Sequence, residues 1–473
     1  MPNQRNASRI ANILLFLIII FGSWLRIEAS IKTEVDRPLR SDALGYFSSA
    51  YNMKQYGVYS RDQSFLLEKK EGKPKPDAVS PPGYPLFLLP FASDAPTDKT
   101  ILHITLTQAV LGILTILLTF ITASQFMGRT WALAPSLLVA ISPHLVNSGV
   151  YVLTESLFTF LMMATITCLA IQINKPENRW LPVAFGLLLG AAALTRPTLN
   201  YILPFLLAAL LPFFGKELRW KWALGVIAGY AIIMAPWSTR NWLNLDNQSS
   251  TLIISTLVHG HYPGAMYKWD PQTLGYPYRF DPEIAQLTTS VSAALQGIMA
   301  RASAEPITYA IWYLIGKPLM FLSWDDVAST GEFFTYPTTV SPYHSAPLFL
   351  ASKYVMWATH YIWLILAVLA VFATANRWKD AAQDRKLLIP LLLSVFFTYF
   401  ILVHIAGFPI ARYSVPLLPV IFILAAYSLL IMQNEYKQRL SLIKNKAPHT
   451  EPNVKLQNTN GLMKAGRHFF ATP

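Results

Sequence analysis

The chain has little charge and almost no cysteine. Of its 473 residues, 13% are charged and 53% are hydrophobic, whereas about a quarter of the residues are charged in typical soluble domains. This composition excludes a disordered protein and argues against a soluble enzyme. The single cysteine, Cys168, excludes an internal disulfide and a zinc site built from several cysteines.

Common catalytic and nucleotide-binding motifs are also missing. The segments expected on the inner side of a membrane contain neither GxxxxGK[ST] nor GxGxxG, and the chain has no HExxH and no Ser-His-Asp order typical of hydrolases. These absences argue against a cytoplasmic nucleotide site, a zinc protease and a serine hydrolase.

Long hydrophobic runs are what the sequence has in abundance. A helix needs about 20 apolar residues to cross a bilayer. Candidate spans are 11–29, 101–126, 132–150, 156–173, 181–195, 198–214, 222–239, 349–374, 387–407 and 410–432. The two short runs, 181–195 and 198–214, could form a broken pair around Arg196-Pro197. We predict an all-α polytopic membrane protein, a helical bundle of about ten spans.

The distribution of charge predicts the orientation of these spans. If the N-terminus is cytoplasmic, the inner segments carry the whole net charge of +13, and the rest of the chain is neutral. This agrees with the positive-inside rule. The basic character therefore reflects membrane topology, and we expect no nucleic-acid partner. We predict a multi-pass protein of a bacterial inner membrane with both termini in the cytoplasm.

The spans divide the chain into a membrane body, two long outer segments and a tail. The body covers 1–432, and its outer segments, 30–100 and 241–348, are rich in Pro, Gly, Tyr and Trp and are expected to carry amphipathic helices. Residues 433–473 form a polar, basic tail that we predict to be cytoplasmic and disordered. The apolar run 309–323, which contains Lys317-Pro318, is expected to be interfacial or re-entrant.

The first outer segment contains a candidate catalytic carboxylate. Asp42, Tyr46 and Ser49 follow helical spacing and would share one face. Ser41 or Asp42 could equally cap that helix. Further along, Ser80-Pro81-Pro82-Gly83-Tyr84-Pro85 predicts a rigid return to the membrane.

Three arginines and a second carboxylate are expected at the same outer level. Glu155 begins a span, where it could simply stabilise the helix dipole, although an ionisable residue bordering hydrocarbon also indicates a functional site. Arg196, Arg240 and Arg412 lie at the outer ends of other spans. One arginine could be explained by snorkelling. Three of them beside carboxylates favour a site for an anionic group, because the planar guanidinium binds two phosphate oxygens.

Other polar residues allow more than one interpretation. His259 and His261 could bind a metal, but hydrogen bonding within a loop is the simpler explanation. Asp325-Asp326 could hold a cation or be a solvated pair. His404, near the outer end of a span, could pack against its neighbours or line a cavity.

The order of these motifs resembles the GT-C superfold of membrane glycosyltransferases, especially the protein O-mannosyltransferase and lipid A aminoarabinose-transferase group. The resemblance covers roughly 10–432. It rests on six segments in order, beginning with Asp42-Ala43-Leu44-Gly45-Tyr46 and Pro81-Pro82-Gly83-Tyr84-Pro85. The others are Thr154-Glu155-Ser156-Leu157-Phe158, Leu194-Thr195-Arg196-Pro197-Thr198, Pro236-Trp237-Ser238-Thr239-Arg240-Asn241 and Arg412-Tyr413-Ser414-Val415-Pro416.

The resemblance implies a glycosyltransferase with a polyprenyl-phosphate-linked sugar as donor and a hydroxyl of a glycan, lipid or protein as acceptor. The family's first acidic position matches Asp42, the expected general base, and its second matches Glu155. Arg196, Arg240 and Arg412 would stabilise the departing phosphate, while Tyr46 and Tyr84 would stack on the sugar. A divalent cation, Mg²⁺ or Mn²⁺, could bind among Asp42, Glu155, His259 and His261.

Two residues depart from the family pattern. Ala43 replaces the second acid that many relatives carry, and Ser80 replaces the lysine that precedes the Pro-Pro pair in aminoarabinose transferases. Phosphate recognition by that lysine is therefore not expected.

A flippase for a lipid-linked sugar is the alternative function, although its expected midplane charges and inverted repeats are not evident. A non-catalytic scaffold would leave the clustered carboxylates and arginines unexplained.

Overall fold

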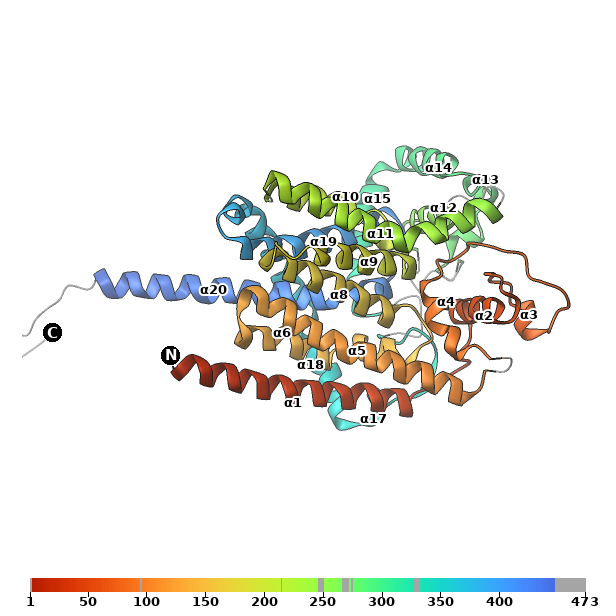
Figure 1. Cartoon of the computed structure of the whole chain (residues 1–473). Coiled ribbons are helices and arrows are strands. Elements are labelled where there is room, and N and C mark those ends of the chain that lie inside the picture. Colours follow the sequence, from red (N-terminus) through yellow and green to blue (C-terminus); the bar gives the residue numbers. More distant parts are fainter. Residues whose placement is uncertain are drawn as a thin grey trace, which may run out of the picture. The chain divides into compact units, whose positions relative to one another are not determined.

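The structure, a computed structural model, describes residues 2–93, 96–213, 215–245, 251–265, 272–273, 275–326 and 332–446 (Figure 1). The chain divides into two compact units, Met1–Leu430 and Ile431–Pro473. The described part of the second unit, 431–446, is helical, because it belongs to helix α20 (Leu418–Lys446). The disorder predicted for the tail thus does not apply to 433–446, and the remaining tail residues lie outside the described ones.

Seven helices among the described residues are long and apolar enough to cross a membrane. They are α1 (Pro2–Lys32), α5 (Asp98–Met127), α8 (Glu155–Asn174), α11 (Lys216–Asn244), α18 (Pro347–Asn376), α19 (Leu388–Ala406) and α20. A bent helix pair gives an eighth candidate. The predicted all-α membrane fold is confirmed. The predicted count of ten is not reached by length, because α9 (Trp180–Thr195) and α10 (Ile202–Leu210) are shorter than a full crossing.

The bent pair consists of α6 (Arg129–Ile141) and α7 (Pro143–Asn147), which continues as η2 (Ser148–Val150). The two halves meet at 53°. Pro143 has no N–H to donate to Val139, so the bend leaves helix carbonyls without their usual partner. Arg26 of α1 supplies donors instead, to Val139 O at 2.8 Å and to Ala140 O at 2.9 Å. This bend directs the chain toward Glu155.

Glycines allow close packing of α9 against α11. Gly186 and Gly190 lie one turn apart on α9, and Gly225 and Gly229 do so on α11. A Cβ atom at Gly186 would come within 2.2 Å of the Val226 carbonyl oxygen. Small residues at this spacing let helix backbones approach closely in membranes. The contact holds the end of α9, which precedes Arg196, against the bundle.

The first outer segment contains short helices between α1 and α5. They are α2 (Ser41–Tyr56), α3 (Ser64–Leu67), α4 (Gly83–Leu88) and η1 (Leu89–Phe91). A Cβ atom at Gly83 would lie 2.6 Å from the Leu194 carbonyl oxygen. Only glycine therefore allows α4 to pack so closely on the end of α9.

The second outer segment, between α11 and α18, is also built of short helices. They are α12 (Thr251–Gly260), η5 (Pro277–Arg279), α13 (Ile284–Leu287), α14 (Val291–Ala304), α15 (Pro306–Ile311), the π-helix η6 (Trp312–Gly316), α16 (Lys317–Phe321) and α17 (Pro342–Ser345). In α12–α14, Ile254, Val258, Leu287 and Ala294 form a small apolar core. The run 309–323 contains the end of α15, the π-helix η6 and α16.

Two short strands join the outer segments. Strand β1 (Glu34–Val35) pairs antiparallel with β2 (Thr338–Val340), with Glu34 opposite Val340. The remaining short helices are η3 (Pro197–Leu199), η4 (Leu211–Phe213), η7 (Trp378–Ala382), η8 (Arg385–Leu387) and η9 (Ala411–Leu417). The strand pair brings residues that follow 332 next to the first outer segment.

Candidate active site

Asp42 lies in the first turn of α2, between two arginines from distant parts of the chain. Its Oδ1 atom is 3.2 Å from Arg61 Nη2, and its Oδ2 atom is 2.7 Å from Arg412 Nη2. Neither Ser41 nor Asp42 caps the helix, because the N-cap position is Arg40 and no side chain bonds there. The Asp42 carboxylate therefore faces cations.

Gly45 makes room for this arrangement. A Cβ atom at Gly45 would lie 2.0 Å from Arg61 Nε, so any side chain at this position would displace Arg61. Burial raises the pKa of Asp42, but the positive charges of Arg412 and Arg61 outweigh it and lower the pKa below its ordinary value. Asp42 is thus held as a carboxylate.

Glu155, the first residue of α8, forms the second carboxylate of the site. Its Oε1 atom is 3.4 Å from Arg196 Nη1. Its Oε2 atom is buried and has no hydrogen-bond partner among the described residues. Leaving such an oxygen without a partner is costly. Glu155 also lines the adjacent pocket.

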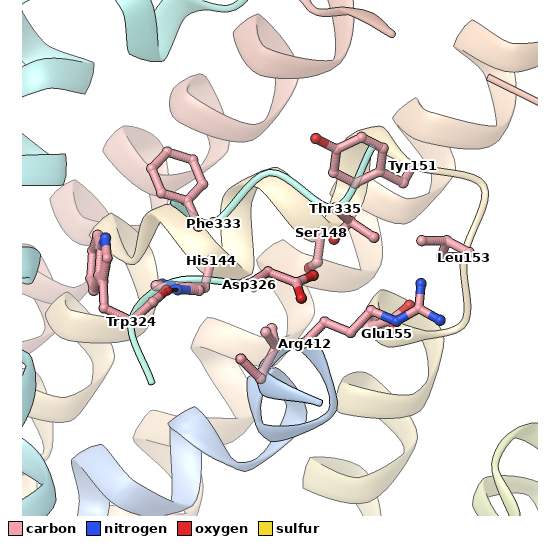
Figure 2. A pocket seen from close by; sticks show the side chains of 12 residues that line it. His144, Ser148, Tyr151, Leu153, Glu155, Trp324, Asp326, Phe333, Thr335 and Arg412 are labelled. Atoms are coloured by element: carbon pink, nitrogen blue, oxygen red, sulfur yellow. Dashed lines mark hydrogen bonds between the residues drawn. The ribbon is translucent and has the colours of Figure 1, made fainter. Parts of the chain in front are cut away.

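The pocket is open to solvent, and about 380 Å³ of space not filled by protein atoms lies within it, part of it solvent. Figure 2 shows Glu155, Asp326 and Arg412 pointing into the same region. The lining residues are His144, Ser148, Tyr151, Leu153, Glu155, Trp324, Asp326, Phe333, Thr335, Ala411, Arg412 and Val415. Carboxylates, hydroxyls and aromatic rings around an arginine suit a polar ligand that carries an anionic group.

One wall of this pocket comes from the second outer segment. Two histidines hold it: the Nε2 atom of His144 is 2.8 Å from Trp324 O, and that of His360 is 2.8 Å from Leu322 O. These contacts place buried Asp326 in the pocket wall. The sequence contained a signal for this acid, the Asp325-Asp326 pair, but gave no reason to place it beside Arg412.

Tyr46 and Tyr84 are in contact, but they have different surroundings. Their rings meet edge to face at 5.4 Å, and the Arg61 guanidinium lies 5.8 Å from the Tyr46 ring centre. Tyr84 is 0% exposed, and its hydroxyl donates to Gln108. Gln108 in turn donates to the carbonyls of Gly149 and Tyr151. Tyr84 therefore supports the loop before Glu155, and it has no free face on which a sugar could stack.

Arg240 does not join the other predicted arginines. It donates to Asp77 O at 2.6 Å and to Tyr59 O at 2.8 Å, and its guanidinium packs on the rings of Tyr59 and Trp237. Arg61, which the sequence did not single out, pairs with Asp42. Asp77 links the two arginines, because its Oδ2 atom accepts a bond from the Arg61 backbone N–H.

His259 and His261, which the sequence allowed as possible metal ligands, lie in a separate cluster. His259 stacks on Tyr278 at 3.8 Å. His261 Nδ1 is 2.6 Å from Val258 O, and its Nε2 is 3.1 Å from Arg301. Burial lowers the pKa of His261 to about 4. In the described part of the chain, no three His, Cys, Asp or Glu side chains come together in a group able to hold a metal ion.

His404 packs behind the arginines and does not line the pocket. Its ring stacks on Phe321 at 4.5 Å and lies 5.8 Å from Tyr413. Tyr413 also contacts Arg196, whose guanidinium is 4.5 Å from the ring centre. The two arginines of the site are thus adjacent through Tyr413.

Comparisons with known proteins agree with this architecture. A family model described as dolichyl-phosphate-mannose-protein mannosyltransferase matches residues 81–239, about a third of the chain. The match includes Glu155 and Arg196 and ends before Arg412. A solved structure of the oligosaccharyltransferase of Archaeoglobus fulgidus, tethered to an acceptor peptide, superposes with a TM-score of 0.51 at 14% identity, over 91% of this chain and 50% of that one. The chain has the GT-C fold of membrane glycosyltransferases.

Two further solved structures share this likeness at lower scores. The oligosaccharyltransferase AglB of Archaeoglobus fulgidus, in complex with an inhibitory peptide and a dolichol-phosphate, gives a TM-score of 0.48 at 12% identity, over 94% of this chain and 53% of that one. ArnT of Cupriavidus metallidurans, bound to undecaprenyl phosphate, gives 0.41 at 14% identity, over 94% and 82%. The chain spans about half the length of the oligosaccharyltransferases. No curated protein matches it.

Proposed function

We propose that the protein is an integral-membrane glycosyltransferase that moves a sugar from a polyprenyl-phosphate-linked donor to a hydroxyl acceptor. The observation that carries this proposal is the pocket lined by Glu155 and Arg412, the arginine that also pairs with Asp42. A buried Glu155 oxygen without a partner and an arginine open to the pocket suit a ligand with hydroxyl donors and an anionic group. A sugar joined to a phosphate has both.

Asp42 acts as the general base in this mechanism. It takes the proton of the acceptor hydroxyl, whose oxygen attacks the anomeric carbon with inversion. The bond between the anomeric carbon and the phosphate oxygen breaks, and the polyprenyl phosphate leaves with the electron pair. Arg412 and Arg196 stabilise the charge that develops on that oxygen. Glu155 accepts a hydrogen bond from a sugar hydroxyl through its second oxygen.

Donor binding would also strengthen the base. In the structure, Arg412 is bonded to Asp42 at 2.7 Å. A donor phosphate competes for this guanidinium, and each hydrogen bond that Arg412 transfers to the phosphate is lost to Asp42. The pKa of Asp42 then rises toward its ordinary value, which makes the carboxylate a better proton acceptor. The site would therefore become basic only when the donor is present.

The family likeness supports a lipid-linked donor. The matched family is named for a dolichyl-phosphate-mannose donor, and an apolar bundle offers the tail of such a lipid a suitable surface. Asp42 and Glu155, which the resemblance suggests as ligands of a divalent cation, are each paired with an arginine in the structure. The distribution of basic residues supports an active site on the outer face of a bacterial inner membrane, with cytoplasmic termini.

The test is sugar transfer by the purified protein in lipid. The substrates are a panel of radiolabelled polyprenyl-phosphate sugars and a membrane extract as acceptor. We expect label to leave the lipid phosphate with the wild-type protein. Asp42→Asn should lower the rate about 10²- to 10⁴-fold, the usual effect of a general base. Asp36→Asn is the matched control, because Asp36 lies in the same outer segment and pairs only with Arg37 and Arg40 among the described residues.

The outcomes separate the candidate functions. Normal turnover by folded Asp42→Asn would refute the assignment of the base. Label that moves across the bilayer but stays on its phosphate would instead identify a flippase.

A further inference from the structure

Lys317 is a buried lysine that the mechanism does not use. It begins α16, its side chain is 0% exposed, and no carboxylate of the described residues lies within ion-pair distance of its nitrogen. Burial lowers the pKa of Lys317 to about 7. Burying an ammonium without a carboxylate is costly. Its contacts therefore need an explanation.

The Lys317 nitrogen contacts the C-terminal end of α19. It donates to Ile405 O at 2.7 Å and to Gly407 O at 2.9 Å, and it lies 3.8 Å from the centre of the Tyr313 ring. The last carbonyls of a helix have no intrahelical partner and carry partial negative charge. The Lys317 ammonium gives these carbonyls a hydrogen-bond donor, and their partial negative charge in turn stabilises the buried cation. Lys317 thus fixes the point at which α19 ends.

Gly407 is held from a second side as well. A Cβ atom at Gly260, the last residue of α12, would lie 2.0 Å from Gly407 O. The carbonyl of Gly260 accepts a bond from Trp312 Nε1 at 3.0 Å. Trp312 and Lys317 belong to the consecutive helices η6 and α16. These two helices therefore contact Gly407 directly, through Lys317, and indirectly, because Trp312 bonds Gly260, which packs on Gly407.

The chain passes from Gly407 into η9 within a few residues. Helix η9 carries Arg412, which bonds Asp42, and Tyr413, which contacts Arg196. Phe321 of α16 stacks on His404, which in turn lies beside Tyr413. Helix α16 therefore supports both arginines of the site, by the Lys317 bonds and by ring packing.

We propose that Lys317 is a positioning residue, whose bonds to the end of α19 set the place of Arg412 relative to Asp42. This inference rests on the proposed function for its consequences in catalysis. The geometry of the contacts predicts that loss of Lys317 loosens η9 and lengthens the Arg412–Asp42 contact. It also predicts weaker binding of a lipid phosphate, because the arginine that would bind it is misplaced.

The pH profile of transfer reports the Arg412–Asp42 contact. The charged and titratable groups that face Asp42 are Arg412, Arg61, Tyr46 and Tyr336. Asp42 must be ionised to act as a base, so activity falls as the pH drops through its pKa. Arg412 lowers that pKa. Weakening the contact between Arg412 and Asp42 raises the pKa of Asp42, and the acidic limb of the pH profile then moves to higher pH.

The experiment compares Lys317→Met with the wild-type protein in lipid. We expect the acidic limb to move up by about one pH unit, at the lower end of the effect of a neighbouring charge. Binding of undecaprenyl phosphate, measured without any sugar, should weaken about tenfold, as expected for a charge-assisted hydrogen bond in poor geometry. Lys317→Gln, which keeps an N–H donor without the charge, should give a smaller change in both.

Arg301→Gln is the control for a structural effect. Arg301 lies in the same outer segment and pairs with Asp281 and Glu283, both at 2.6 Å. Its loss should lower the unfolding temperature and leave the acidic limb in place. If Lys317→Met does not fold, Tyr313→Leu removes the ring beneath the ammonium and should shift the limb in the same direction.

A folded Lys317→Met protein with the wild-type acidic limb and wild-type binding of undecaprenyl phosphate would overturn the proposal. Failure of the proposed function gives a different result. In that case the wild-type protein transfers no sugar from any donor, and the lipid-phosphate binding of the variants still decides the role of Lys317.

Discussion

At the scale of single residues, the site contains two arginines that each pair with a carboxylate. Arg412 reaches Asp42, and Arg196 reaches Glu155. Each guanidinium is also in contact with the Tyr413 ring. A planar, permanently charged group suits this position, because it can bind a carboxylate, stack on a ring and offer further N–H donors to phosphate.

Replacing Arg412 by lysine tests this requirement. Arg412→Lys keeps the positive charge but loses the planar fork, so we expect the KM for the lipid-linked donor to rise about tenfold or more, as for a charge-assisted hydrogen bond. Steady-state kinetics over donor concentration measures it. Arg279→Lys, at an exposed arginine that packs on Tyr276 in the other outer segment, is the control. Equal KM values for Arg412→Lys and this control would contradict the role given to the guanidinium.

At the scale of elements, interruptions of regular helix bring the site residues together. The bend between α6 and α7 leads to Glu155, the π-turn before α16 precedes Lys317, and the end of α19 leads to Arg412. The bend and the end of α19 each leave backbone carbonyls without an intrahelical partner. A cationic side chain bonds such carbonyls at both places, Arg26 at the bend and Lys317 at the end of α19.

Removing Arg26 should therefore destabilise the bend. Arg26→Met leaves the carbonyls of Val139 and Ala140 without these donors, and we expect the free energy of unfolding to fall by about 2 kcal/mol or more, given the cost of unsatisfied buried acceptors. Thermal unfolding in mild detergent measures the change. Arg9→Met removes an exposed arginine from the same helix and should have little effect. Equal stability of the two variants would show that the bend does not need Arg26.

At the scale of the whole molecule, the spans determine which face the site occupies. Helices α9 and α10 are too short to count as full spans by length. If both or neither cross, and the bent pair counts as one span, the total is ten or eight. Both numbers are even, so both termini lie on the same side. The positive-inside rule predicts that this side is the cytoplasm.

Reporter fusions test this topology. Alkaline phosphatase inserted after Lys73, in the first outer segment, should be active, because the enzyme matures only outside the cytoplasm. The same reporter fused to the C-terminus should be inactive, and a fluorescent protein fused there should fluoresce. The reverse pattern would place Asp42 and its arginines on the cytoplasmic face, and the proposed outer-face reaction would then be wrong.

The sequence by itself determined the class of protein and most of its helices. Hydropathy and charge are local properties of the chain, so they predict spans without any knowledge of tertiary contacts. The motif order also predicted the GT-C fold, which the structural comparison confirms. The placement of Arg412 at the same outer level as the carboxylates was also expected from the sequence.

Only the tertiary structure decided which side chains meet. Arg61 pairs with Asp42, whereas Arg240 binds backbone carbonyls elsewhere. Tyr84 is a buried support, and His259 and His261 lie in a separate cluster. Asp326 lies in the pocket wall because His144 and His360, from two other helices, hydrogen-bond the backbone just before it. The physical reason is that these contacts join residues far apart in the chain. Their distances depend on how helices pack, and neither hydropathy nor local spacing encodes that packing.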